Sequence, residues 1–425
     1  MRFDFVPTFR PSISEWNEGL EAYTRKYVEN TPEVKRSGLA RVIPPKEWKW
    51  LRKNAFENVK PITFKPIRQC TSTRAGVTRC QIQEMKTSTI SEFETFVKKS
   101  HATPSNIEEK LKRNDNIIDE DCIATIERAF WKTSLSHTSK PGVYGADIKA
   151  SLFEKDVEAC GRGWNFSNLE SILTRGLSKE ERENLHGVAS SYLYVGSWGS
   201  MFAWHTEDYE LNSVNYIHQG KPKVWYSIPP AYAKRFECVA ASLFAAESKE
   251  CPEFLRHKTC MISPTKIRSY GIPVCRQVCY EGQLMITFPR AYHAGFNVGF
   301  NIAESTNFAT ASWIPLGLDA KHCTCQEKIE IREEQKRLKA GKRKRRRRSS
   351  SESVVKINVH RMLIRLRETY PVVFEQRPDL LSHLSNAEKL FTDSDNEEVV
   401  LRKKEAKKMK VLPDQCLPVI ERVQE

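Results

Sequence analysis

Short runs in which apolar and polar residues alternate constrain the fold of this 425-residue chain most strongly. They lie between residues 190 and 310, and Gly, Pro and Asn separate them. Because side chains on a strand point alternately to its two faces, each run predicts a short strand with one buried face. Short strands joined by such turns are typical of an antiparallel barrel or a double-sheet jelly roll. The runs are residues 191–195, 213–217, 224–228, 283–288 and 300–304.

The N-terminal segment, residues 5–50, is expected to begin with a short helix. Ser12 precedes Glu15 by three positions, which is the capping box that marks the first turn of a helix. Apolar side chains then recur at helical spacing from Trp16 to Tyr27, so one face of this helix is predicted to be buried.

The rest of the chain divides by composition. Residues 51–154 mix helical patterns with charged stretches, whereas residues 155–325 contain the strand-like runs. Residues 326–425 are rich in charge and are expected to be largely disordered, because such a composition buries too little apolar surface to fold. The apolar stripe from Val355 to Leu366 predicts one helix within this tail.

Composition excludes several classes of protein. No window approaches the roughly 18 consecutive apolar residues that a membrane-spanning helix needs, and the first residues have no pattern of a secretory signal. Twelve cysteines without such a signal favour buried thiols or metal ligands over disulfides, and a cytosolic or nuclear compartment. The net charge of +15 suits polyanionic partners such as nucleic acid, acidic proteins or anionic lipid, without choosing among them.

The triplet His205-Thr206-Glu207 is a candidate metal site. On a strand, positions i and i+2 share a face, so His205 and Glu207 can chelate one ion. His293, which ends the strand-like segment 284–292, is the best third ligand. Two histidines and one carboxylate form the facial triad of non-haem Fe(II) oxygenases. Taken alone the triplet is weak, because a surface or core histidine followed by a glutamate arises often by chance.

Other metal enzymes with related motifs fit less well. Zinc deaminases follow H-x-E with P-C-x-x-C, but here Pro273, Cys275 and Cys279 have the wrong spacing. The H-E-x-x-H motif of metalloproteases is absent from the sequence.

Lys223 is a candidate for the cation that a 2-oxoglutarate oxygenase needs for the far carboxylate of its cosubstrate. It precedes a strand-like run in which Val224, Tyr226 and Ile228 would occupy the opposite face. An inward lysine needs an anionic partner, since an unpaired buried charge is costly. Without the triad, an exposed lysine at a sheet edge would be the simpler interpretation.

Several longer motifs carry a family resemblance. The sequence resembles a JmjC domain in AWHTED (203–208), NY (215–216), GKPKVWY (220–226), ITFP (286–289), YHAGFN (292–297) and AESTNFA (303–309). It resembles a JmjN domain in GLARVIPPKEW (38–48). The combination is similar to the JmjN/JmjC histone demethylases that act on trimethylated lysines 9 and 36 of histone H3, and the resemblance covers about residues 5–325.

This resemblance implies a mainly β fold with helical additions: a double-stranded β-helix, or cupin-like jelly roll, as the JmjC core, with a packed N-terminal JmjN segment. The implied domains are JmjN (5–50), a mixed α/β linker region packed on the core (51–154), the JmjC domain with a C-terminal zinc site (155–325) and a basic tail (326–425).

The resemblance also implies the cofactors. Fe(II) would be held by His205, Glu207 and His293. The cosubstrate 2-oxoglutarate would be held by Lys223 and Tyr144, with Asn215 nearby.

The resemblance also implies which residues form the substrate pocket. The resemblance implies that the methylated ammonium group lies among aromatic rings and oxygen atoms, where a cation is favoured. Tyr192 and Tyr194 are spaced by two and are expected to share one strand face, although core packing is an even alternative from spacing alone. The implied substrate-binding residues are Gly187, Tyr192, Tyr194, Glu207, Ser305, Thr306 and Asn307.

A second metal is implied as well. The resemblance assigns Zn(II) to a site beside the catalytic domain, and a Cys3His set suits structural tetrahedral zinc. From spacing alone, two alternatives stay open. These cysteines could be buried thiols without metal, or the zinc ligands could include Cys275, Cys279 or His322. The implied ligands are Cys251, His257, Cys323 and Cys325.

The implied reaction is removal of methyl groups from tri- and dimethylated lysine through N-methyl hydroxylation and release of formaldehyde. Hydroxylation of a protein side chain by the same iron centre, or binding of methyl-lysine without catalysis, are the alternatives. The sequence departs from the family pattern at Gln81, Met201 and Arg290-Ala291, which bears on the preference for one histone site over the other.

The tail predicts where the protein acts. Seven consecutive basic residues from Lys342 to Arg348 favour a nuclear localisation signal or a contact with nucleic acid, with a solvated charge run as the plain alternative. The serines 349–351 and Ser394 are candidate phosphorylation sites because basic or acidic residues flank them. The basic run therefore favours a nuclear location. The family resemblance implies that chromatin and the methylated histone H3 tail are the partners, and no membrane is expected.

Overall fold

The computed structural model describes residues 3–48, 55–113, 117–134, 140–153, 163–325 and 357–390. The basic run, the serines 349–351 and Ser394 lie outside the described residues. The chain divides into two compact units, Met1–Val359 and His360–Glu425.

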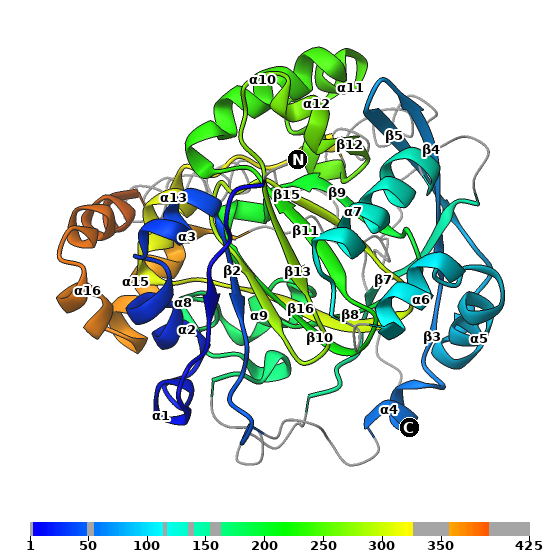
Figure 1. The fold of residues 1–425 in the computed structure, drawn as a ribbon. Coiled ribbons are helices and arrows are strands. Elements are labelled where there is room, and N and C mark those ends of the chain that lie inside the picture. The colour runs from blue at the N-terminus through cyan, green and yellow to red at the C-terminus, as the bar shows by residue number, and fades with distance from the viewer. Residues whose placement is uncertain are drawn as a thin grey trace, which may run out of the picture. The chain divides into compact units, whose positions relative to one another are not determined.

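The first unit is built on two sheets of mostly antiparallel strands (Figure 1). In the large sheet β1 and β2 pair in parallel and the other pairs are antiparallel. Its strands are, in spatial order, β1 (Thr8–Phe9), β2 (Leu39–Val42), β14 (Leu284–Thr287), β10 (Asn212–Gly220), β16 (Asn301–Phe308), β8 (Tyr192–Gly196), β7 (Gly142–Ile148), β4 (Ile67–Arg74), β5 (Val77–Glu84) and β12 (Cys260–Ile262).

The small sheet completes the core. It contains β13 (Cys275–Cys279), β11 (Lys223–Ser227), β15 (His293–Asn297) and β9 (Met201–His205), and a separate pair is formed by β3 (Thr63–Phe64) and β6 (Ser88–Thr89). All five alternating runs fall on strands, namely β8, β10, β11, β14 and β16. The expected mainly β fold with a jelly-roll, cupin-like core is confirmed.

The two faces of the small sheet have different surroundings. Trp225 lies with Ile217 and Met285 of the large sheet in the apolar layer between the sheets. Val224 and Tyr226 belong to a larger cluster with helices on the other side. Alternation along β11 therefore separates an inward face from a helix-covered face, as predicted. The helices of this cluster include α6 (Ser105–Arg113), α7 (Glu120–Arg128), α10 (Ala233–Leu243) and α12 (Pro264–Arg268).

The N-terminal segment covers the outer side of the large sheet. The capping box of Ser12 and Glu15 is present at the start of the first helix. Trp16 stacks on Trp164 with ring centroids 3.6 Å apart. The expected single helix is wrong, because Gly19 adopts a φ of 85° and interrupts it. The segment instead contains α1 (Ile13–Trp16), α2 (Leu20–Tyr23), the π-helical turn η1 (Thr24–Val28) and α3 (Pro32–Ser37).

Further helices lie in the parts of the first unit that the structure describes, and most of them are short. They are α4 (Ala55–Val59), α5 (Ile90–Ser100), η2 (Ala129–Ser134), η3 (Phe166–Asn168), α8 (Ile172–Gly176), α9 (Lys179–Asn184), η4 (Asp208–Glu210), η5 (Pro230–Tyr232), α11 (Ala245–Glu250), η6 (Phe254–His257), η7 (Ala311–Trp313) and α13 (Ile314–Leu318).

The tail is more helical than expected. The described part of the apolar stripe, from Val359 to Leu366, lies on α15 (Val359–Thr369), where Met362 and Leu366 are buried, whereas Val355 lies outside the described residues. A second helix, α16 (Val372–Gln376), follows Pro371, and residues 380–390 are also helical, so the expectation of one helix is corrected. Within the described parts of the chain, no helix is long and apolar enough to cross a membrane.

Candidate active site

The triad residues come from neighbouring strands of the small sheet. His205 is the last residue of β9 and pairs directly with His293 on β15. Glu207 follows β9 rather than lying on it, in extended backbone (φ −69°, ψ 153°) that keeps its side chain on the side of His205. His293 begins β15, whereas the sequence placed it at the end of a strand: β14 stops at Thr287.

The ligand atoms of these three residues converge. The Nε2 atom of His293 lies 3.3 Å from Glu207 Oε1, and that of His205 lies 4.0 Å from the same oxygen. All three ligand atoms lie within 4.8 Å of one another. Three donors so placed can bind one metal ion on one side and leave the other side open.

Backbone hydrogen bonds orient both histidines. Nδ1 of His205 lies 2.7 Å from Ala203 O, and Nδ1 of His293 lies 3.0 Å from Ala291 O. Each Nδ1 therefore carries the proton and donates it to a carbonyl, which leaves Nε2 as a lone-pair donor for metal.

Electrostatics favour the protonation states that bind metal. Burial, assisted by the positive charge of Lys258, lowers the pKa of His205 well below its ordinary value. Burial acts to raise the pKa of Glu207, but the close contact with His293 and the positive charge of Lys258 outweigh it and hold this pKa well below its ordinary value. A neutral imidazole and an ionised carboxylate are the forms that metal binding requires.

Lys223 is buried on the inward face of β11, with 1% of its surface exposed. Its Nζ donates a hydrogen bond to Asn297 Oδ1 over 2.7 Å, and it lies 5.7 Å from the centre of the Tyr144 ring. Among the described residues no carboxylate forms an ion pair with it, and burial lowers its pKa to about 7. The site thus contains a buried amine that lacks an anion.

Asn215 is a second group with unused hydrogen-bonding capacity. It is buried on β10, and no described residue hydrogen-bonds to its Oδ1 atom. Buried polar atoms are almost always satisfied, so an unsatisfied one points to a ligand or water. Together, the amine of Lys223 and the amide of Asn215 fit a cosubstrate with a carboxylate and other polar oxygens.

Tyr192 and Tyr194 share one face of β8, as the spacing predicted. Leu193 and Val195 between and after them pack in the apolar cluster on the other face. The Tyr194 hydroxyl donates a hydrogen bond to Asp147 Oδ1 over 2.9 Å. Gly187 has a φ of 78°, and a Cβ atom there would lie 2.3 Å from the Tyr192 ring, so only glycine fits against this ring.

The residues of β16 point in different directions. Ser305 lies between Asn215 of β10 and Tyr192 of β8 in the sheet. Asn307 Nδ2 donates a hydrogen bond to Glu207 Oε2 over 3.2 Å, so it orients the triad carboxylate. Thr306 does not face the same way: its hydroxyl donates to Val188 O on the other side of the strand.

The four predicted zinc ligands form a compact cluster. Cys323 Sγ lies 3.7 Å from Cys251 Sγ and 3.3 Å from His257 Nε2, and Cys325 Sγ lies 3.6 Å from His257 Nε2. Ligand atoms about 2.0–2.3 Å from a tetrahedral zinc ion lie about 3.3–3.8 Å from one another. The alternatives are placed elsewhere, since Cys275 and Cys279 belong to the apolar layer between the sheets and His322 stacks near Tyr209.

Two residues of this region had no role assigned from the sequence. Asn297 bonds Lys223 and also donates to the Ser200 backbone and hydroxyl. Asp147 accepts from Tyr194. Strand alternation from His293 would have placed Asn297 on the inward face, whereas Asp147 sits at a φ of 56° that no sequence signal marked.

Most of the residues that depart from the family pattern do not lie on the inward face of the two sheets. Met201 packs in the helix-covered cluster, while its neighbour Phe202 packs inward against Trp225. Gln81 lies exposed on β5. Arg290 adopts a φ of 60°, and its backbone N–H donates to Glu210 Oε2.

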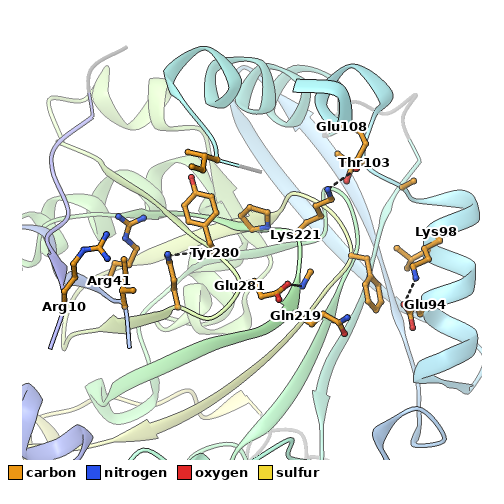
Figure 2. A pocket seen from close by; sticks show the side chains of 18 residues that line it. Arg10, Arg41, Glu94, Lys98, Thr103, Glu108, Gln219, Lys221, Tyr280 and Glu281 are labelled. Carbon is orange, nitrogen blue, oxygen red and sulfur yellow. Dashed lines mark hydrogen bonds and ion pairs between the residues drawn. The ribbon is translucent and has the colours of Figure 1, made fainter. Parts of the chain in front are cut away.

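A separate open cavity of about 1060 Å³ holds none of the predicted site residues. It surrounds the turn between β10 and β11, at the end of β11 away from the residue paired with His293. Figure 2 shows Arg10 and Arg41 on one side of it, and Lys221 paired with Glu108 on the other. It is therefore distinct from the triad.

Comparisons with known proteins agree with this geometry. Residues 192–308 match the JmjC domain, described as a hydroxylase. Probable lysine-specific demethylase 4F of Homo sapiens is 40% identical over 324 residues, which are 76% of this chain and 47% of the relative.

Other members of the group give a similar result. Lysine-specific demethylase 4B of Mus musculus is 41% identical over 325 residues (76% of this chain, 27% of the relative). Lysine-specific demethylase 4D of Rattus norvegicus is 38% identical over 324 residues (76% of this chain, 58% of the relative). The match thus spans less than two thirds of each of these curated relatives. Residues 192–308 thus match a JmjC domain of the hydroxylase type, and 76% of the chain is similar to the lysine-specific demethylase 4 proteins, as its motifs predicted.

Proposed function

We propose that this protein is an Fe(II)- and 2-oxoglutarate-dependent histone demethylase. It removes methyl groups from tri- and dimethylated lysine 9, lysine 36 or both of histone H3, and so regulates chromatin and transcription. The observation that carries the proposal is the convergence of His205, Glu207 and His293 in the same barrel as Lys223, a buried amine without an acidic partner among the described residues.

The triad would hold the iron. His205 and His293 each offer Nε2, and Glu207 offers a carboxylate that Asn307 orients. When bound, Fe(II) with 2-oxoglutarate and O2 supplies the oxidation that hydroxylates an N-methyl group, after which formaldehyde leaves. No lone pair on the substrate nitrogen is needed, so trimethyl-lysine is a permitted substrate.

Lys223 would bind the far carboxylate of 2-oxoglutarate, with Tyr144 and Asn215 beside it. The dianion compensates the buried amine, and this compensation supports selection of a dicarboxylate. Asn297 holds the ammonium group in place from the side of β15.

The methylated lysine would enter between Tyr192 and Tyr194, beside Gly187, Glu207, Ser305 and Asn307. Aromatic rings and oxygen atoms attract a methylated ammonium group and select against neutral side chains. Thr306 would act indirectly, because its hydroxyl binds the backbone next to Gly187.

Two further assignments complete the proposal. Zn(II) would occupy the cluster of Cys251, His257, Cys323 and Cys325 as a structural ion. The protein would act in the nucleus on the H3 tail in chromatin, with the run from Lys342 to Arg348 serving import or a nucleic-acid contact.

Mass spectrometry of histone H3 peptides tests the proposal. Peptides trimethylated at lysine 9 or at lysine 36 are incubated with the protein, Fe(II), ascorbate and 2-oxoglutarate. His205→Ala removes a triad ligand. His101→Ala is the matched control, since the His101 ring packs against Phe96 at the end of α5, outside the triad. Stepwise loss of methyl masses with the wild type and His101→Ala, but not with His205→Ala, is expected.

The same spectra separate the alternatives. A gain of one oxygen without loss of a methyl group would indicate a side-chain hydroxylase. Unchanged peptide that still binds the protein, with 2-oxoglutarate unconsumed, would indicate a methyl-lysine binder and refute catalysis on these substrates.

A further inference from the structure

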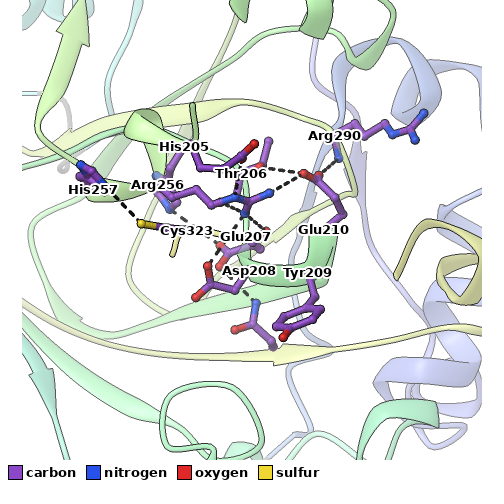
Figure 3. A network of polar contacts seen from close by, with 12 residues as sticks. His205, Thr206, Glu207, Asp208, Tyr209, Glu210, Arg256, His257, Arg290 and Cys323 are labelled. Carbon is purple, nitrogen blue, oxygen red and sulfur yellow. Dashed lines mark hydrogen bonds and ion pairs between the residues drawn. The ribbon is translucent and has the colours of Figure 1, made fainter. Parts of the chain in front are cut away.

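Arg256 connects the Cys3His cluster to the turn that carries Glu207. It lies on η6, between the cluster residues Cys251 and His257. Its side chain is only 8% exposed. From there it reaches the backbone that follows β9 (Figure 3).

The guanidinium group is bonded on several sides. One terminal nitrogen donates to Glu207 O over 2.7 Å, and the other donates to Glu210 Oε1 over 2.8 Å. Nε donates to Glu253 Oε2 over 3.1 Å on the same helical turn. A planar fork of donors can satisfy acceptors in these directions together, which a lysine ammonium group on a flexible stem cannot do.

The turn held by Arg256 has an unfavourable backbone. Tyr209 and Glu210 have φ values of 54° and 53°, in the left-handed region that residues with a side chain rarely adopt. Such a conformation persists only where surrounding contacts enforce it. Here Glu210 also accepts from Thr206 and from the Arg290 backbone, so its carboxylate ties the turn together (Figure 3).

We propose that Arg256 is a positioning residue for the iron ligand Glu207, and that it transmits the order of the Cys3His cluster to the iron site. This inference rests on the proposed function, because it concerns the metal that the triad would hold. Asn307 fixes the carboxylate of Glu207, whereas Arg256 fixes its backbone. Without Arg256 the turn relaxes and the carboxylate leaves the position that the two histidines require.

Metal affinity of the full-length, zinc-loaded protein tests this role. Mn(II), a redox-inert probe of the triad, is titrated and the free ion is followed by electron paramagnetic resonance. The variants are Arg256→Lys, which keeps the charge, and Arg256→Met. The matched controls are Arg276→Lys and Arg276→Met, because the Arg276 side chain is also largely covered (12% exposed) and bonded to two carboxylates, but outside the site.

We expect both Arg256 variants to weaken Mn(II) binding about 10- to 100-fold, as loss of groups that orient ligands does elsewhere. The Arg276 variants should lower thermal stability but leave Mn(II) affinity within about twofold of the wild type. Equal Mn(II) affinity of folded, zinc-loaded Arg256→Lys and wild type would overturn the proposal. Equal losses in the Arg276 variants would also overturn it, since the effect would then reflect general destabilisation.

Coupling to the cluster is tested by a double-mutant cycle. Cys325→Ser, which removes a cluster ligand, should weaken Mn(II) binding in the wild type but have little further effect in Arg256→Met. If the losses of Mn(II) affinity in Cys325→Ser and Arg256→Met add up in the double variant, the proposed transmission through Arg256 is wrong. Mn(II) binding by the wild type no tighter than by His205→Ala would instead refute the proposed metal site itself, and the inference with it.

Discussion

Replacing Lys223 with methionine should stabilise the free protein and abolish tight binding of 2-oxoglutarate. The ordinary pKa of a lysine is 10.5, and burial lowers that of Lys223 to about 7. This difference corresponds to ~5 kcal/mol of unfavourable free energy in the folded state below pH 7. Methionine has a similar length and carries no charge, so it removes that cost.

The substitution loses little in return. The hydrogen bond from Lys223 to Asn297 disappears, which costs about 1 kcal/mol. Asn297 Oδ1 still accepts from Asn301 Nδ2 over 2.9 Å, so it is not left unsatisfied. The expected net gain in the free energy of unfolding is ~4 kcal/mol at pH 6.

The gain should depend on pH. The folded-state pKa of Lys223 lies below its unfolded value, so the cost is fully present below pH 7 and fades as the pH rises from about 7 to 10.5. The advantage of Lys223→Met should therefore be largest at pH 6 and small near pH 10.

Binding should change in the opposite direction. Removing one partner of a buried ion pair costs about 3–5 kcal/mol, so the affinity of the Mn(II)-loaded protein for 2-oxoglutarate should fall about 100- to 4000-fold. Urea unfolding at several pH values and isothermal titration calorimetry measure the two effects. Lys221→Met, in the turn before β11, is the matched control, because Lys221 pairs with Glu108 outside the site.

The test is strict because Lys223→Met should raise the stability of the free protein but lower its affinity for 2-oxoglutarate. A variant that is several kcal/mol less stable than the wild type at pH 6, or that gains stability equally at pH 6 and pH 10, would contradict the buried-charge argument. Retention of wild-type affinity for 2-oxoglutarate would show that Lys223 does not bind the cosubstrate.

Three further predictions concern the neighbouring groups. Asn307→Ala removes the hydrogen bond to Glu207, so Mn(II) affinity measured by paramagnetic resonance should fall about 10- to 100-fold, and an unchanged affinity would refute the orienting role. Gly187→Ala displaces the Tyr192 ring, because the new Cβ would lie 2.3 Å from it. The kcat/KM for the methylated peptide should then fall about 10²-fold, while the affinity for 2-oxoglutarate stays unchanged. Equal losses of kcat/KM and of 2-oxoglutarate affinity would contradict a local effect on the substrate pocket. Cys323→Ser should lower both the zinc content found by elemental mass spectrometry and the melting temperature, whereas stoichiometric zinc in this variant would place the ion elsewhere.

Local sequence patterns predicted the parts of the fold that depend on neighbouring residues. Alternation gave the strands β8, β10, β11, β14 and β16 and placed Lys223 opposite Val224 and Tyr226. The capping box at Ser12 formed as predicted, because it needs only residues within one helical turn.

Other expectations failed where a local pattern competes with a backbone irregularity. The apolar spacing from Trp16 to Tyr27 suggested one helix, but the positive φ of Gly19 breaks it. The segment before His293 reads as continuous strand, although Arg290 turns the chain at a φ of 60° after β14. Such turns leave no periodic signal, since a single residue decides them.

The sequence by itself determined the residue types and spacings of the site: the His-x-Glu triplet, the inward lysine and the cysteine pair near residue 324. Only the tertiary structure decided which distant residues meet. It paired His293 with His205 across β15 and β9, inserted β2 of the N-terminal segment beside β14, and brought Arg256 to the backbone of Glu207. The physical reason is that periodicity fixes the face of a side chain, whereas strand register and loop closure fix its neighbours, and these depend on the packing of the whole core.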